Sequence, residues 1–230
     1  MFQIYMPTVA PDDWKRGLTD PDLHWKVGYS ARALASCWEN YKLKGLPPEI
    51  NHIFRETSKS AFNKISLLIG LPEHHVILPG GSRASQNDLF LLAKDSNSDL
   101  ISITVEGKVN ETFGPTLDEW KTTWTSGKAE RLAYIQSALG ISQELPGSTR
   151  YQLLHRTASA VVEAMRFNAK SAIMIVHSFS TSDMWFDDFK AFVQLYKREA
   201  QIGQLIPLNT ANGIDIYTAW VKGDAKWLQT

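Results

Sequence analysis

The stretch that decides the fold runs from Ser85 to Asn110 and reads SQNDLFLLAKDSNSDLISITVEGKVN. Strand-forming residues fill both of its arms. Residues 95–99 (DSNSD) between the arms are typical of turns, because their side chains hydrogen-bond their own backbone. We therefore predict an antiparallel hairpin over residues 86–109. Side chains alternate along a strand, so Glu106 and Lys108 of the second arm share one face.

The register of this hairpin decides whether a site forms. If Lys94 pairs with Leu100, Asp88 stands opposite Glu106, and directly opposed side chains lie about 5 Å apart at Cβ. Two carboxylates at that distance raise each other's pKa unless a cation lies between them. Mg²⁺ or Mn²⁺ suits such a pair because these ions take oxygen ligands, and Lys108 would then orient or deprotonate the attacking water. A register slip of one residue would turn Asp88 to the opposite face and destroy the site. The alternative interpretation is that Asp88 is a turn or cap residue and that the Glu-x-Lys pair is a solvated surface pair.

Composition limits the class of protein. The chain has 230 residues, enough for one domain with a substantial core. Its 24 Lys and Arg balance 24 Asp and Glu, so a nucleic-acid enzyme would need a locally basic groove. The single cysteine excludes a disulfide framework and a cysteine-based zinc site. The start of the sequence does not resemble a signal peptide, and no apolar run is long enough for a bilayer, so we expect a soluble, cytoplasmic protein without a membrane partner.

The chain divides into three stretches within one predicted domain, residues 1–230. Residues 1–29 are rich in proline and tryptophan and predict an extended N-terminal wrap. Residues 30–178 form the predicted core, which begins with helices over 31–42 and 48–68 and a first strand over 74–79. Glu39 on the first helix either faces solvent or reaches a site on the adjacent sheet. Residues 179–230 predict a helix and a last strand over 214–221.

The second half of the core predicts a crossover. Residues 150–167 carry a regular apolar stripe typical of a helix, and residues 171–178 form a continuous apolar run typical of a strand buried on both faces. A strand that follows a helix in this way is expected to pair in parallel with an earlier strand. Gln152 and Arg156 are four residues apart on the helix, so they either contact a phosphate or metal-bound water, or are ordinary surface polar residues.

Two further features suggest ligand contacts. The loop Pro79-Gly80-Gly81-Ser82-Arg83 resembles a phosphate-cradling loop without the Gly-Lys-Ser/Thr ending of a P-loop, and its glycines and Arg83 are candidates to line a substrate backbone. His177 with Ser178 and Ser180 at a strand end suggests a hydrolase, but the chain has no Gly-x-Ser-x-Gly elbow.

The order of helices, three strands carrying an acid and then Glu-x-Lys, a crossover helix and a buried strand resembles the PD-(D/E)XK nuclease superfamily. Asp88, Glu106 and Lys108 carry the resemblance, Gln152 is a looser match, and Asn87 stands where the motif has proline. The resemblance implies an α/β, restriction-endonuclease-like core: a mixed central sheet, with the antiparallel hairpin 86–109 and a parallel strand near 171–178, flanked by helices. It also implies that the two acids hold Mg²⁺ and that the lysine assists the attacking water.

Longer strings, such as HWKVGYS (24–30), VEGKV (105–109) and RYQLLHRTASA (150–160), are similar to a bacterial domain family of uncharacterised function, over nearly the whole chain.

From these features we expect a nuclease, a metal-dependent phosphodiester hydrolase that acts on nucleic acid, with DNA favoured over RNA. Asp88 and Glu106 would bind Mg²⁺ or Mn²⁺, and the Val105 carbonyl is a further candidate ligand because hard cations take backbone oxygens. Gln152, Arg156 and Arg83 would contact the substrate. Enzymes of this fold that cut both strands are often dimers, so a homodimer is one expected arrangement. The alternatives are a catalytically silent interaction module with the same fold, or a hydrolase centred on His177.

Overall fold

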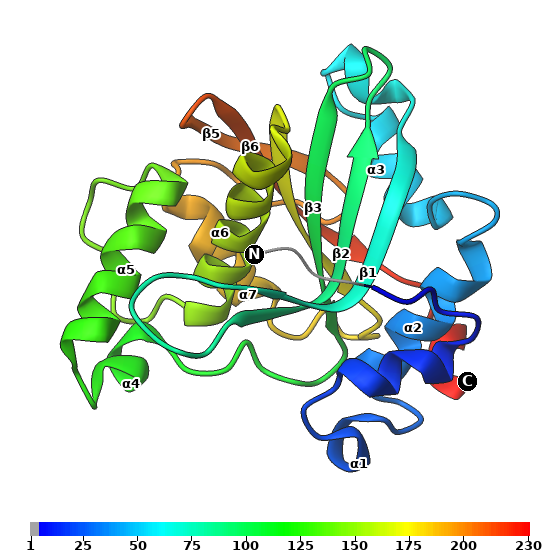
Figure 1. Ribbon diagram of the computed structural model, residues 1–230, viewed down its shortest axis with the longest axis horizontal. Helices are drawn as coiled ribbons and strands as arrows, with labels where there is room; N and C mark the ends of the chain where they lie inside the picture. The colour runs from blue at the N-terminus through cyan, green and yellow to red at the C-terminus, as the bar shows by residue number, and fades with distance from the viewer. Residues whose placement is uncertain (1–4) are drawn as a thin grey trace.

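Six strands form one mixed sheet in the order β1-β2-β3-β4-β6-β5 in the computed structural model, which describes residues 5–230 (Figure 1). The strands are β1 (Ser66–Val76), β2 (Ser85–Lys94), β3 (Leu100–Lys108), β4 (Ser171–Ser178), β5 (Leu205–Ala211) and β6 (Ile214–Lys222). The α-helices are α1 (Pro21–His24), α2 (Ser30–Tyr41), α3 (Pro48–Arg55), α4 (Leu117–Lys121), α5 (Ser126–Leu139), α6 (Tyr151–Phe167) and α7 (Phe186–Gln194). Three short 3₁₀ helices are η1 (Pro11–Gly17), η2 (Ser60–Asn63) and η3 (Ala225–Gln229).

The predicted hairpin forms in the predicted register. Lys94 pairs with Leu100 and Leu89 with Val105, so the next position places Asp88 beside Glu106. The turn is held by Asp95, whose carboxylate accepts hydrogen bonds from the backbone N–H groups of residues 97 and 99.

The crossover is also confirmed. β4 pairs in parallel with β3, and the connection between them contains α4, α5 and then α6, which packs on the sheet. Two hydroxyl groups of β3 fix the helix, because Ser102 donates to the carbonyl of Ala160 and Thr104 donates to the carbonyl of Arg156. α6 therefore runs antiparallel to β3, and its first turns lie at the strand end that carries Glu106.

Helices cover both faces of the sheet and divide the core into two main clusters. One cluster packs α4, α5, α6 and α7 against one face, and the other packs η1, α2 and α3 against the opposite face. Figure 1 shows α4, α5 and α6 on one side of β1–β3 and α1 and α2 on the other. β4 is buried along its whole length. The protein therefore has the expected α/β fold, a mixed sheet flanked by helices.

The region before the hairpin differs from the prediction. The helix expected over 48–68 ends at Arg55, and β1 begins at Ser66 instead of His74. β1 is stabilised by antiparallel pairing with β2 from Ser66↔Lys94 to Val76↔Ser85, a tertiary contact that local propensity does not reveal. Within the expected N-terminal wrap, residues 5–29 contain two short helices, η1 and α1, while residues 1–4 lie outside the described part of the chain. The C-terminal stretch contains β5 in addition to the expected helix and last strand.

Candidate functional site

Three carboxylates lie on three neighbouring strands at one end of the sheet. Asp88 and Glu106 face each other across β2 and β3, as described above. On the other side of Asp88, the pairs Pro72↔Leu89 and His74↔Asn87 place Glu73 of β1 next to Asp88. The backbone of Glu73 has φ of 51°, in the left-handed region, and interrupts the ladder at this position.

These acids line a cavity of ≈ 310 Å³ together with Lys108, Gln152 and Arg156. The side chains come from β1, β2, β3 and the first turns of α6. The remaining lining residues are Leu18, Thr19, His24, Ser30, Ala31, Gln86, Gly107 and Glu111, so the segment before α2 closes one side of the cavity. The structure thus brings together five of the residues predicted or suggested from the sequence and adds Glu73.

Glu106 is the most heavily bonded of the three acids. Its oxygens accept from Lys108 Nζ at 2.6 Å, from Arg156 Nε at 2.6 Å and from Gln152 Nε2 at 2.7 Å. Burial alone raises the pKa of a carboxyl group, but the charges of Arg156 and Lys108 outweigh burial and hold the pKa of Glu106 at about 2. Glu106 is therefore ionised at neutral pH.

Asp88 and Glu73 lack such partners. Asp88 accepts a hydrogen bond from the backbone N–H of Gly107 at 2.8 Å, and burial together with the charge of Glu106 raises the pKa of Asp88 to about 7. Burial and the neighbouring Asp88 likewise raise the pKa of Glu73 to about 8, although Gln86 donates to it at 2.8 Å. Near neutral pH these two acids therefore hold protons that a cation in the cavity could replace.

A second set of contacts positions Arg156. Its Nη1 donates to Ser85 Oγ at 3.2 Å, and Ser85 Oγ lies 2.8 Å from Nδ1 of His155. Burial and the nearby Arg156 charge lower the pKa of His155, so the imidazole is neutral and can accept the Ser85 proton. Arg156 is thus held between Glu106 and Ser85.

Three other predicted residues lie close to this cavity without lining it. Asn87 is buried, and its Nδ2 donates to the carbonyls of His74 and Ser85, which ties β2 to β1. Val105 lies in the middle of the sheet and pairs on both sides. Arg83 lies in the loop between β1 and β2 and lines a separate, adjoining cavity.

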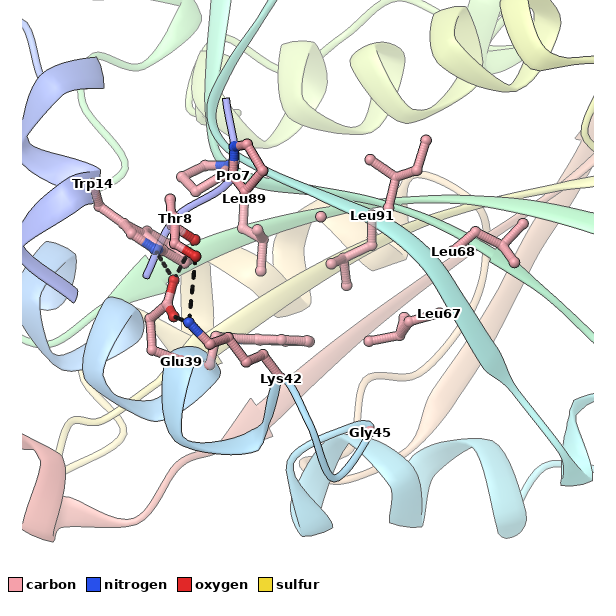
Figure 2. Close-up of a pocket in the computed structure, with 14 residues that line it drawn as sticks. Pro7, Thr8, Trp14, Glu39, Lys42, Gly45, Leu67, Leu68, Leu89 and Leu91 are labelled. Atoms are coloured by element: carbon pink, nitrogen blue, oxygen red, sulfur yellow. Dashed lines mark hydrogen bonds and ion pairs between the residues drawn. The ribbon is translucent and has the colours of Figure 1, made fainter. Parts of the chain in front are cut away.

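Glu39 belongs to a different cavity, shown in Figure 2, between α2 and the face of β1 and β2. It accepts hydrogen bonds from Thr8 Oγ1 at 2.6 Å and Trp14 Nε1 at 2.9 Å and forms an ion pair with Lys42. Figure 2 shows these polar groups gathered at one end of the cavity, with Leu67, Leu68 and Leu91 further along it. Glu39 therefore anchors the N-terminal segment to α2 and does not reach the three acids.

His177 is fully buried, in contact with α2 and α3. Trp38 Nε1 donates to its Nδ1 at 3.3 Å, which puts the imidazole proton on Nε2, facing Glu49 at 3.1 Å. Cys37 lies nearby, and ligand atoms of Cys37, Glu49 and His177 all fall within 4.8 Å of one another. Because both imidazole nitrogens are engaged and burial raises the pKa of the Cys37 thiol, this cluster is a satisfied hydrogen-bond network.

Glu73 is not among the residues predicted from the sequence, because the predicted first strand over 74–79 begins one residue after it. A strand over 66–76 that pairs with the first arm of the hairpin would have put Glu73 beside Asp88. The sequence signal was present in the apolar run Leu67-Leu68-Ile69, which suits a strand as well as a helix.

The fold and the site define an α/β domain with a carboxylate-rich cavity at the end of three neighbouring strands. The chain belongs to the family described as "Domain of unknown function (DUF6946)", whose model matches residues 7–225. Neither the curated proteins nor the solved structures contain a significant match to the chain. Within residues 5–230, none of the helices combines the length and the apolar character that crossing a membrane requires.

Proposed function

We propose that this protein is a metal-dependent phosphodiester hydrolase with a PD-(D/E)XK-like site. The observation that carries the proposal is the hairpin register, which puts Asp88 beside Glu106, with Lys108 two residues further along β3. The order of the elements supports it, because an acid on β2, Glu-x-Lys at the end of β3, a crossover helix and a parallel β4 follow one another.

The residues of the cavity fit a divalent cation. Four acidic residues line it, Glu73, Asp88, Glu106 and Glu111, against two basic residues, Lys108 and Arg156. The buried Oε1 of Gln152 has no hydrogen-bond partner in the described part of the chain. Asp88 and Glu106 would hold Mg²⁺ or Mn²⁺, with Glu73 beside them. When bound, such an ion polarises a phosphoryl oxygen and lowers the pKa of water.

Lys108 and the first turns of α6 supply the remaining groups. The ammonium of Lys108 lies 5.0 Å from the ring centre of Phe113 and donates to Glu106, so its position at the cavity is fixed. It would orient the attacking water and offset the charge that develops on the phosphate. Gln152 and Arg156 would contact phosphate oxygens, and Arg156 also balances the charge of Glu106. The proposed substrate is nucleic acid, with DNA favoured.

A cleavage assay tests the proposal. Plasmid DNA, single-stranded DNA and RNA are incubated with Mg²⁺, Mn²⁺ or EDTA and with wild type, Asp88→Asn, Lys108→Met or Glu130→Gln. Glu130 is an exposed acid on α5 and serves as the matched control. We expect wild type and Glu130→Gln to cut in a metal-dependent manner. Asp88→Asn and Lys108→Met should both lose this cutting. Cutting that survives Asp88→Asn and Lys108→Met would show that another centre is responsible.

A catalytically silent interaction module is the second candidate. Lys108, Gln152 and Arg156 already occupy both oxygens of Glu106, an arrangement that also suits a purely structural ion-pair network. Such a module would show no Mn²⁺ binding that depends on Asp88, and none of the three substrates would be cut.

A further inference from the structure

A second cavity, of ≈ 520 Å³, adjoins the carboxylate cavity. Ser85 and His155 line the second cavity, and Arg156, which lines the first, donates to Ser85 at 3.2 Å. The two cavities therefore share a wall that is one layer of side chains thick. A ligand in the second cavity would lie next to the proposed catalytic groups.

The second cavity is basic where the first is acidic. Arg83, Lys128 and Arg131 line it, and no acidic residue does. In the described part of the chain, none of these three cations forms an ion pair with a carboxylate. Arg83 is exposed, and within residues 5–230 its guanidinium has no hydrogen-bond partner. The chain is neutral overall, so this is a local concentration of uncompensated positive charge.

The loop between β1 and β2 adds backbone donors to this charge. The guanidinium of Arg131 donates to four carbonyls of the loop, those of Leu78, Pro79, Gly81 and Arg83, at 2.8–3.1 Å. With its carbonyls turned to Arg131, the loop leaves the N–H groups of residues 80–83 without a hydrogen-bond acceptor in the described part of the chain. Unpaired backbone N–H groups on an exposed loop are available to bind an anion.

The loop is also held in place. Gly80 has φ of 80°, and a Cβ there would lie 2.4 Å from the backbone nitrogen of Arg131. The loop is therefore packed directly on α5, and its donors are preorganised. Trp120 and Tyr151, stacked with ring centres 4.2 Å apart, supply an aromatic wall to the same cavity.

We propose that this basic cavity binds the part of a single nucleic-acid strand that adjoins the phosphate to be cut. This inference rests on the proposed hydrolase function. Phosphates next to the cut site find Lys108 and Arg156 of the first cavity already paired with Glu106, whereas the second cavity offers them Arg83, Lys128 and the loop N–H groups, across the wall formed by Ser85 and His155. The stacked rings of Trp120 and Tyr151 give the cavity an apolar wall for the sugars of the strand.

The test is binding of a fluorescently labelled single-stranded oligonucleotide of about ten nucleotides, followed by anisotropy in EDTA, so that no metal takes part. Wild type is compared with Arg83→Ala, Arg83→Lys and Lys128→Gln. The control is Arg198→Ala, which removes an exposed arginine that does not line the cavity.

We expect Arg83→Ala and Lys128→Gln each to weaken binding about fivefold, as for one exposed charge pair. Each should also reduce the slope of log affinity against log salt by about 0.7, the value for one lost phosphate contact on a single strand. Arg83→Lys should keep the wild-type slope, and Arg198→Ala should bind like wild type.

The inference is overturned if wild type does not bind, or if Arg83→Ala and Lys128→Gln bind as tightly as Arg198→Ala. A Mn²⁺ titration of wild type and Asp88→Asn separates this failure from failure of the proposed function. If Mn²⁺ binding requires Asp88 but oligonucleotide binding does not require Arg83, the basic cavity is not a strand-binding site and the proposed hydrolase function still stands. If oligonucleotide binding requires Arg83 but Mn²⁺ binding does not require Asp88, the proposed metal site is contradicted and the strand-binding cavity is supported.

Discussion

Glu106 shows how the site compensates a buried charge. Its carboxylate is almost fully buried, and Arg156 and Lys108 each lie 2.6 Å from one of its oxygens. Removal of one member of such a group leaves the others without compensation, which costs more than the loss of an exposed pair. The ion pairs therefore serve stability as well as the proposed chemistry.

This burial leads to a prediction about stability. Arg156→Met should lower the free energy of unfolding by about 3 kcal/mol, because it leaves the buried Glu106 with Lys108 as its single cationic partner. Urea unfolding measures the change. The control is Lys15→Met, which breaks the exposed pair with Asp12 and should cost less than about 1 kcal/mol. Equal effects of the two substitutions would contradict the compensation described here.

The raised pKa values of Asp88 and Glu73 predict a dependence of stability on pH. In the folded protein the pKa of Asp88 is about 7 and that of Glu73 is about 8, compared with ordinary pKa values of 3.8 and 4.5. Both groups therefore hold their protons more tightly in the folded protein than in the unfolded chain. Between these limits the folded state binds more protons than the unfolded chain, so stability falls as the pH rises. The lowered pKa of Glu106 acts in the opposite direction, but between about 2 and its ordinary value of 4.5.

Asp88→Asn removes one of these two groups. We therefore expect the wild type to lose more unfolding free energy than Asp88→Asn between about pH 5.5 and about pH 8, as measured by urea unfolding at both values. Every other titratable group is present in both proteins. Identical losses would show that Asp88 is not buried as an uncompensated acid.

At the scale of elements, the hairpin could be predicted and its neighbour could not. The turn residues 95–99 fix the pairing of Lys94 with Leu100, and this local signal was enough to place Asp88 beside Glu106. The crossover of α6 and β4 followed from an apolar stripe and a buried run, which are also local. These parts of the site are encoded within short stretches of sequence.

β1 depends on a distant partner. Its apolar residues fit a helix as well as a strand, and its pairing with β2 decides between the two. Without β1, the position of Glu73 beside Asp88 cannot be predicted. The same holds for the contacts of Gln86, which donates to Glu73 and to the carbonyl of Gly17. Likewise, the sequence gives no sign that Lys108 and Arg156 both bind Glu106, because this needs the packing of α6 on β3.

η1 covers β1 so closely that its last residue must be glycine. A Cβ on Gly17 would lie 2.4 Å from Cβ of Glu73. We expect Gly17→Ala to lower the free energy of unfolding by about 2 kcal/mol, in thermal or urea unfolding, because the cover of the cavity must shift.

The matched experiment places Gly17→Ala in a Glu73→Gly background. Glu73→Gly removes the clashing Cβ and also suits the left-handed backbone at this position. In that background Gly17→Ala should cost less than in wild type, and a cycle of the four proteins gives the coupling. Additive effects would mean that the contact between η1 and β1 does not hold the cover in place.

On the scale of the whole molecule, charge is separated although the chain is neutral. The 24 acidic and 24 basic residues give no net field, yet the carboxylate cavity has a local excess of acids and the adjoining cavity contains cations alone. The two cavities lie on either side of Ser85, at the strand ends where β2, β3 and α6 meet. This arrangement suits a polyanionic chain that meets a metal ion at one of its phosphates.

The most direct test of this account is a calorimetric titration of Mn²⁺ into wild type, Asp88→Asn and the exposed control Glu130→Gln at about pH 8, where protons compete least for Asp88. The account predicts that Mn²⁺ binds saturably to wild type and to Glu130→Gln. In Asp88→Asn this binding should be lost, or weakened at least tenfold (about 1.4 kcal/mol). Equal binding by all three proteins, or no binding to wild type, would contradict a metal site between β2 and β3.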